Sequence, residues 1–212
     1  MELREDIDDF LKEIPKNVSL VAATKYVDAT LMRNLYKHNV KDFGENRVEA
    51  FLEKYDALQD LDITWHFIGH LQRNKAKQVI NKIDYLHSLD SLELAKIINE
   101  KREKTLKCFV EVSINNEATK NGVKVCDVVP FIKALLNYKN IEVIGLMMMS
   151  IKYSSHTELL NQFIKLKNLK DEINKEKNIN LQFLSMGMSD DYKEAISCGA
   201  THIRLGRILW KN

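Results

Sequence analysis

Lys25 is the residue of this chain whose type and position most directly allow covalent chemistry. It follows the apolar run LVAAT, so a strand over residues 18–26 would carry this lysine at its C-terminal end. In barrels of parallel strands those ends hold the reactive groups, and desolvation there favours the neutral amine, a nucleophile toward aldehydes. The alternative is a solvated lysine that opens the following helix, and the pattern alone favours this alternative.

Arg204 and Gly206 form a second candidate, in the segment HIRLGR. A strand over residues 202–205 would place Arg204 on one face with Gly206, while Ile203 and Leu205 would pack against outer helices. An arginine that points into a barrel stays charged and needs an anionic or acceptor partner. Gly206 would let the backbone approach a ligand closely. The alternative for Arg204 is an internal salt bridge.

The segment SMGMSDD, residues 185–191, predicts a phosphate site. It combines a strand end, a glycine turn and Ser189 as the N-cap of a helix over residues 190–198. The free N–H groups and the positive dipole at a helix start suit phosphate. Barrel phosphate sites often use the loops after the seventh and eighth strands, which here carry Ser189 and the pair Gly206 and Arg207. A serine cap alone is weak evidence, and the two adjacent loops strengthen it.

His66 and His70 resemble a metal-binding pair. Four strand residues would separate them by ~13 Å, too far to share one ion, so we expect no metal site. His66 either lines the mouth of a barrel or is a buried, hydrogen-bonded histidine, and the sequence leaves both interpretations open. The chain contains no Walker A motif, Rossmann fingerprint or G-x-S-x-G elbow.

Eight short β-rich runs recur along the chain, and polar segments with helical spacing separate most of them. The runs cover residues 18–26, 40–45, 64–69, 85–89, 107–114, 141–149, 181–186 and 202–205. Strands that alternate with helices pair in parallel. We therefore expect an α/β fold, a single (β/α)8 TIM-type barrel. The alternative is an open, doubly wound sheet, which the same alternation would produce.

The helical segments have signals of their own. Apolar residues recur at helical spacing over residues 155–177, and Asp90 followed by Glu93 indicates a helix start with a capping box. The last strand ends almost at the C-terminus, with no eighth helix behind it. The first fourteen residues carry an apolar helical face and stop at Pro15. We expect this N-terminal helix to cover the gap left after the last strand.

Bulk properties narrow the class of protein. With 212 residues, 45% of them hydrophobic and 29% charged, the chain is expected to form one globular domain over residues 1–212. A net charge of +2 argues against nucleic-acid partners, and no apolar run reaches the ~20 residues of a membrane span. The acidic N-terminus is no secretory signal, and three scattered cysteines indicate free thiols. We expect a soluble, cytoplasmic protein without membrane partners.

Seven segments together resemble the pyridoxal phosphate homeostasis protein family, also called the proline synthase co-transcribed homologues. They run in order over nearly the whole chain: VAATKY at 21–26, FGENR at 43–47, WHFIGHLQRNKAK at 65–77, VEVSINNEATKNGV at 110–123, GLMMM at 145–149, LSMGMSDDYKEAI at 184–196 and IRLGR at 203–207. Seven ordered matches are far more specific than any single motif. The resemblance implies one barrel similar to the N-terminal domain of alanine racemase.

The resemblance also implies a cofactor, pyridoxal 5′-phosphate (PLP), held as a covalent Schiff base on Lys25. Arg204 would face the pyridine nitrogen, and Asn46 and His66 would lie close to the cofactor. Five residues would surround the phosphate, partly through backbone N–H groups: Ser185, Met188, Ser189, Gly206 and Arg207. Arg207 stands where many members have threonine, so its contact would be ionic or through the backbone.

The resemblance favours a protein that stores or delivers PLP, with apo PLP-dependent enzymes as candidate partners, over an enzyme. Arg204 cannot accept a proton, so it would leave the ring nitrogen neutral and the electron sink weak. The alanine racemase tyrosine on the opposite face comes from an additional domain that we do not expect here, so no catalytic residue is assigned. The alternatives are a PLP-dependent amino-acid racemase or decarboxylase, and a barrel that binds another phosphorylated ligand. We expect a monomer or a weak homodimer.

Overall fold

The β-rich runs fold as the strands of a barrel in the computed structural model, which describes residues 2–114 and 121–211. The middle of the 110–123 motif, residues 115–120, lies outside the described residues. The barrel strands are β2 (Ser19–Ala23), β3 (Asp42–Glu45), β4 (Thr64–Phe67), β5 (Tyr85–Leu89), β6 (Leu106–Ser113), β8 (Ile141–Met147), β9 (Phe183–Ser185) and β10 (His202–Leu205).

The barrel is closed by parallel pairing all the way round. Each strand pairs with its neighbour in the chain order, apart from the short strand β7 (Val123–Lys124), which adds to the side of β6. The last strand, β10, pairs in parallel with the first, β2, and β5 pairs with β6. Closure leaves the ring without the two edges of an open sheet, so the predicted (β/α)8 barrel is confirmed and the doubly wound alternative is wrong.

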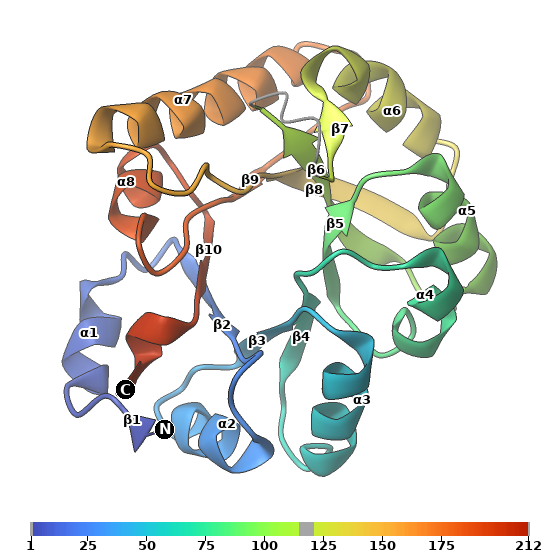
Figure 1. The fold of residues 1–212 in the computed structure, drawn as a ribbon. Coiled ribbons are helices and arrows are strands. Elements are labelled where there is room, and N and C mark those ends of the chain that lie inside the picture. Colours follow the sequence, from blue (N-terminus) through green and yellow to red (C-terminus); the bar gives the residue numbers. More distant parts are fainter. Residues whose placement is uncertain (1, 115–120, 212) are drawn as a thin grey trace.

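Helices surround the ring of strands in chain order, as Figure 1 shows. They are α1 (Ile7–Glu13), α2 (Ala29–Tyr36), α3 (Val48–Ala57), α4 (Arg73–Val79), α5 (Leu92–Lys101), α6 (Val128–Leu135), α7 (His156–Ile173) and α8 (Tyr192–Ser197). Among the described residues, no α-helix follows β10. The short 3-10 helix η2 (Arg207–Leu209) comes directly after that strand.

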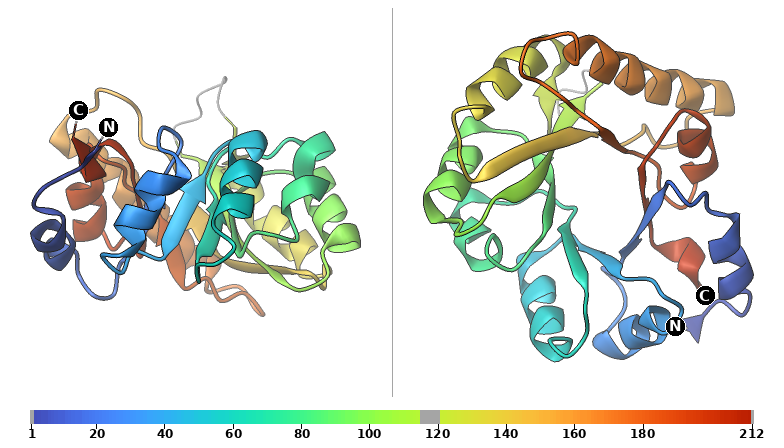
Figure 2. Two further views of the ribbon diagram at one scale, coloured as in Figure 1. Left: turned by 90° about the horizontal axis from the view of Figure 1, so that it is seen from below. Right: turned by 180° about the vertical axis from the view of Figure 1, so that it is seen from behind.

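The N-terminal helix occupies the place that an eighth helix would take. In Figures 1 and 2, α1 lies beside α8 and the C-terminal segment, and the ring of Phe10 meets Tyr192 of α8 at 6.0 Å between centroids. The predicted cover is confirmed, although the helix is shorter than the first fourteen residues. The chain start instead forms β1 (Glu2–Leu3), which pairs antiparallel with β11 (Trp210–Lys211).

The helix predicted over residues 155–177 forms as α7, which ends earlier at Ile173, whereas the helix start predicted at Asp90 differs. Helix α7 begins with a capping box, in which the Ser155 side chain and Glu158 exchange hydrogen bonds with each other's backbone N–H groups. The capping box predicted at Asp90 is wrong, because the N-cap of α5 is Ser91, without a side-chain cap hydrogen bond. No helix in the described part of the chain combines the length and apolar character needed to cross a bilayer.

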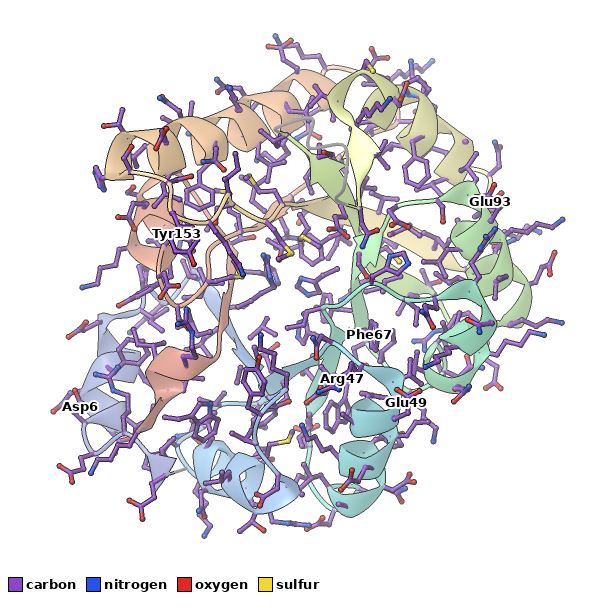
Figure 3. All side chains as sticks on the ribbon, in the orientation of Figure 1. Asp6, Arg47, Glu49, Phe67, Glu93 and Tyr153 are labelled. Atoms are coloured by element: carbon purple, nitrogen blue, oxygen red, sulfur yellow. The ribbon has the colours of Figure 1, made fainter. Side chains whose placement is uncertain are left out.

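The core has two parts. The larger one fills the layer between strands and helices, and a smaller cluster around Phe109, Ile144 and Met147 lies apart from it. Side chains fill the middle of the ring in Figure 3. Aliphatic side chains usually dominate barrel interiors, but here buried polar side chains share the interior, among them three histidines and Arg204.

Candidate functional site

Arg204 is a buried cation that projects from β10 toward the carboxyl ends of its neighbouring strands. Its guanidinium donates to Ser185 Oγ at 2.6 Å and to the Met148 carbonyl oxygen at 2.9 Å. Burial lowers the pKa of Arg204 to about 10, while Asp191 and Glu111 oppose this shift. No described carboxylate forms an ion pair with it, so the internal salt bridge is wrong. These two bonds use two of the five N–H groups of the guanidinium.

Lys25 lies in a turn two residues beyond the end of β2, not within the strand. Its side chain is exposed, and its Nζ stands 4.7 Å from the centre of the Tyr26 ring. The desolvation expected from the sequence is therefore not seen. Just beyond the strand end at Ala23, the Thr24 hydroxyl donates to Glu45 at 2.7 Å, where a buried network begins.

A buried ion pair holds the backbone beneath Lys25. Lys54 of α3 reaches inward, donates to the Thr24 carbonyl oxygen at 2.6 Å and pairs with Glu45. Glu45 and Thr24 are fully buried. A buried ion pair is weak evidence for net stability, but removing one partner leaves a costly unpaired charge. The network therefore fixes the turn that carries Lys25.

Asn46 follows β3 and carries the one buried side-chain polar atom without a hydrogen-bond partner among the described residues, its Oδ1. A Cβ on Gly69 would stand 2.3 Å from the Asn46 carbonyl oxygen, so glycine is required for this close approach of the two loops. An unsatisfied buried acceptor costs about 1–3 kcal/mol. Such an atom is an acceptor that a ligand can satisfy.

The loops after β9 and β10 are joined through Ser189. Its Oγ accepts hydrogen bonds from the backbone N–H groups of Gly206 at 3.2 Å and Ile208 at 3.4 Å. The prediction that Ser189 caps a helix over residues 190–198 is wrong. Helix α8 begins at Tyr192 and has six residues, with Asp191 as its N-cap, because the Ser189 oxygen serves these distant N–H groups instead.

The remaining predicted phosphate residues lie around this junction, with one exception. Met188 donates its backbone N–H to Asp191 Oδ1 at 2.5 Å. Arg207 is exposed and pairs with Asp190, so its cation is already partnered at the surface. Ser185 is the exception: its hydroxyl is fully buried and bonded to Arg204 and His87.

His66 is fully buried, hydrogen-bonded on both ring nitrogens, and stacked on Tyr85 with ring centres 4.5 Å apart. Its Nε2 lies 2.9 Å from Asp42 and its Nδ1 lies 2.8 Å from His87. These contacts match the second of the two interpretations that the sequence left open. His87 and Asp42 were missed. The alternation of Tyr85, Leu86 and His87 in β5, with Leu86 packed in the outer core, is the signal that could have placed His87 inside the barrel.

A polar cavity of about 740 Å³ lies at the same end of the barrel, between the loops that follow β4 and β5. Its lining includes His70, Gln72, Arg73 and Asp90, and none of the predicted site residues. The described part of the chain contains no group of three or more His, Cys, Asp or Glu side chains placed to hold a metal ion. We therefore place the candidate site at Arg204, Ser189 and Asn46, which lie in β10, after β9 and after β3 at the carboxyl ends of the strands.

Comparisons with known proteins agree with this barrel. The family model described as the N-terminal domain of alanine racemase matches residues 2–212. A protein of Aquifex aeolicus named pyridoxal phosphate homeostasis protein is 40% identical over 194 residues, which are 90% of this chain and 85% of that protein. The solved structure of PipY from Synechococcus elongatus without PLP has a TM-score of 0.92 at 30% identity and covers 98% of this chain and 99% of that chain. The same protein with PLP bound has a TM-score of 0.89, with coverage of 97% and 100%.

Proposed function

Because the chain belongs to the pyridoxal phosphate homeostasis protein family, we propose that it binds PLP as a Schiff base on Lys25 and stores or delivers it with little turnover. The relatives named above bear that family name or hold PLP in a solved structure. The fold and the order of the seven motifs support carrying the ligand over to this chain.

The residues of the site fit PLP. Lys25 offers an exposed amine on a turn held by the Thr24 and Lys54 network. Asn46 Oδ1 is a buried acceptor without a partner among the described residues. The loops joined by Ser189 would take the phosphate, partly through backbone N–H groups. When bound, PLP supplies an electron sink for carbanion chemistry.

One observation carries the proposal of low turnover: Arg204 is a buried guanidinium without a carboxylate partner in the described structure. Its pKa of about 10 keeps it charged at neutral pH. A charged guanidinium has donors only and cannot accept a proton. A ring nitrogen facing it stays unprotonated, which weakens the electron sink on which racemases and decarboxylases depend.

Reduction with borohydride tests the covalent attachment. We expect the PLP-loaded protein to keep a pyridoxyl adduct on Lys25, identified by peptide mass mapping, and to lose its yellow absorption. Lys25→Ala should abolish the adduct. Lys152→Ala is the matched control, because Lys152 is also exposed and lies on the loop after β8, at the same end of the barrel. A Lys25→Ala protein that stays yellow contradicts the attachment and favours a barrel for another phosphorylated ligand.

Turnover separates a carrier from an enzyme. We expect the PLP-loaded protein to convert L- and D-amino acids at rates far below ~1 s⁻¹, the low end of ordinary enzyme turnover. A panel assay for racemisation and decarboxylation, followed by chiral chromatography, measures this. Turnover at an ordinary rate for any amino acid would overturn the homeostasis proposal and favour the racemase or decarboxylase alternative.

Delivery requires a bound cofactor that other proteins can reach. The exposed positions of Lys25 and of Tyr26, which is 65% exposed, support an accessible mouth. We propose apo PLP-dependent enzymes as recipients, in the cytoplasm, for which the three free cysteines are typical. Mixing loaded protein with an apo-enzyme in the presence of a phosphatase that destroys free PLP tests direct transfer. Activation no faster than with free PLP would exclude it.

A further inference from the structure

A continuous chain of hydrogen bonds crosses the inside of the barrel. Asp42 Oδ1 lies 2.9 Å from His66 Nε2, and His66 Nδ1 lies 2.8 Å from His87 Nε2. His87 Nδ1 lies 2.8 Å from Ser185 Oγ, which accepts from Arg204 at 2.6 Å. We call Asp42, His66, His87 and Ser185 the interior relay. Its members come from four different strands, β3, β4, β5 and β9.

The interior relay joins the two ends of the barrel. Asp42 is the first residue of β3, at the amino ends of the parallel strands, and its side chain is 35% exposed. Ser185 is the last residue of β9, at the carboxyl end where the candidate site lies. The two histidines between them are fully buried. Water can therefore reach the relay at Asp42, about one strand length from Arg204.

An ionised Asp42 together with two neutral imidazoles fixes the direction of every hydrogen bond in the relay. Arg204 can only donate, so the Ser185 oxygen accepts from it, and Ser185 directs its own hydrogen to the unprotonated His87 Nδ1. An ionised Asp42 can only accept, so His66 carries its hydrogen on Nε2. His87 then carries its hydrogen on Nε2 and donates to His66 Nδ1. Both imidazoles are neutral in this state, and each has one defined tautomer.

One added proton reverses half of the relay. A proton on His66 gives it two N–H groups, so His87 must accept on Nε2 and carry its hydrogen on Nδ1. His87 then donates to Ser185 Oγ, which already accepts from Arg204, and the hydroxyl hydrogen of Ser185 points to another acceptor. The balance is one proton taken from solvent: the Ser185 oxygen receives it, the former Ser185 hydrogen passes to His87 Nδ1, and the hydrogen of His87 Nε2 passes to His66 Nδ1. No covalent bond between heavy atoms changes.

The three interior histidines differ in the charged groups beside them. Burial lowers the pKa of His202 to about 4 and the pKa of His87 well below its ordinary value, and His66 and Arg204 add to both shifts. Of these three histidines, His66 is the one with a carboxylate at hydrogen-bond distance in the described structure.

Other groups also face His66. Tyr85 of β5 stacks on it, with Lys107 of β6 beyond, and His202 of β10 lies 6.4 Å away between ring centres. Near the Arg204 end, Glu111 and Asp191 raise the pKa of the guanidinium. Asp42 is thus the negative group next to His66. The positive charge of Arg204 opposes proton uptake, and so does His202 where it is protonated.

We propose that the interior relay couples proton uptake at Asp42 and His66 to the binding of an anionic ligand beside Arg204, so that PLP binds with uptake of a proton. The proposal rests on the proposed function, because PLP is the ligand. The phosphate favours added positive charge in the interior, and the released Ser185 hydroxyl supplies one more donor at the site. By linkage, affinity for PLP then rises as pH falls, by up to tenfold per pH unit for one linked proton.

Isothermal titration of the PLP-free protein with PLP tests the coupling. Titrations at one pH in two buffers of different ionisation enthalpy give the number of protons taken up. PLP and Lys25 contribute their own protons in every variant, so the relay is measured as a difference. Asp42→Asn keeps an acceptor at His66 without the charge, and should lower proton uptake and flatten the pH dependence of the Kd. His66→Gln should have the same effect.

The matched control is Asp62→Asn. Asp62 is exposed, precedes β4 at the same end of the barrel, and pairs with Lys41, next to Asp42 in sequence. The Asp62→Asn protein should take up as many protons on binding PLP as the wild type does. Equal proton uptake in all four proteins overturns the relay, while a PLP adduct on Lys25 leaves the proposed function standing. A wild type that binds no PLP overturns the proposed function itself.

A second measurement needs only the wild type, so it tests the relay even if a variant does not fold. Nitrogen-15 NMR of the PLP-free wild type reports which imidazole nitrogens carry hydrogen. We expect both His66 and His87 to be neutral with hydrogen on Nε2 at alkaline pH. On acidification, His66 should gain its second hydrogen while the His87 hydrogen moves to Nδ1. A His87 tautomer that stays constant through the titration of His66 contradicts the relay.

Discussion

Glu111 is a carboxyl group that β6 keeps almost entirely out of water, 9% exposed. Burial and the nearby Asp90 raise the pKa of Glu111 to about 7, against the opposing effect of Arg204. The folded state therefore resists ionisation of this group, while the unfolded chain ionises it near its ordinary pKa of 4.5. The contribution of Glu111 to the free energy of unfolding is fully present below pH 4.5 and is lost as pH rises from there to about 7.

Glu111→Gln should accordingly become more stable than the wild type as pH rises. We expect no difference near pH 4.5 and a gain of about 3 kcal/mol in the free energy of unfolding above pH 7, from a shift of 1.36 kcal/mol per pKa unit. Urea denaturation of both proteins between pH 4.5 and pH 8.5 measures it. Glu142→Gln, an exposed change on the neighbouring strand β8, is the control and should give a flat difference. A flat difference for Glu111→Gln would contradict the raised pKa.

At the residue scale, alternation along a strand predicts where a side chain points but not what it meets. Alternation in β10 placed Arg204 inside the barrel, which the structure confirms. Its partners are Ser185, the last residue of β9, and Met148, the residue after β8, and no local pattern encodes the offset between these strands. Lys25 shows the opposite limit: its pattern favoured a solvated lysine, and the structure indeed shows it exposed. Only the ordered motifs single it out as a cofactor residue.

At the element scale, Gly187 connects β9 to α8 in a conformation that requires glycine. Its φ is +94°, and an added Cβ would stand 2.6 Å from Ala195 Cβ of α8. Gly187→Ala therefore combines a left-handed backbone with a clash between the loop and the helix. We expect a loss of about 2–4 kcal/mol in unfolding free energy, the sum of backbone strain and overpacking, together with weaker PLP binding.

Gly199→Ala separates the two causes. Gly199 has nearly the same φ, +92°, but an added Cβ would meet only the flexible Lys167 side chain at 3.9 Å. Its loss should be about 1–2 kcal/mol, the cost of strain alone, with PLP affinity unchanged. Urea denaturation and PLP titration of both variants give the comparison. Equal losses would show that the packing of α8 against the loop is not tight.

Element ends were the least predictable features, and the reason is long-range hydrogen bonding. The strand predicted over residues 18–26 ends earlier, at Ala23, and the next residue, Thr24, bonds through its hydroxyl to Glu45 of β3. The helix predicted over residues 190–198 begins at Tyr192 because Ser189 serves the N–H groups of Gly206 and Ile208. By contrast, α7 starts where predicted, since its capping box is made entirely within four consecutive residues.

At the scale of the whole molecule, the number of strands and the helices between them could be predicted from the sequence, but closure could not. The eight β-rich runs all became strands. Whether the ring closes depends on the parallel pairing of β10 with β2, residues separated by most of the chain. Apart from the family resemblance, the N-terminal helix gave the hint of closure, because a closed ring with no helix after its last strand leaves a gap that some other segment must cover.

Phe10 is the side chain through which that segment covers the gap. It is 4% exposed, meets Tyr192 of α8 edge to face, and lies 4.3 Å beneath the Arg4 guanidinium. Arg4 in turn donates to the Ile208 carbonyl oxygen at 3.1 Å, so the first residues of the chain are tied to the last. Phe10→Ala removes this contact and leaves a cavity, and should cost about 3–5 kcal/mol in unfolding free energy.

The number of unfolding transitions of Phe10→Ala shows whether α1 is an integral part of the barrel or a segment that can detach from it. If α1 takes the place of the eighth helix, its loss exposes the core between β10 and β2, and the whole ring should unfold in one transition. Circular dichroism and tryptophan fluorescence should then give the same lowered urea midpoint for Phe10→Ala, with Phe10→Leu between it and the wild type. Two separate transitions, with the main one at the wild-type midpoint, would show that α1 detaches from a barrel that is stable without it.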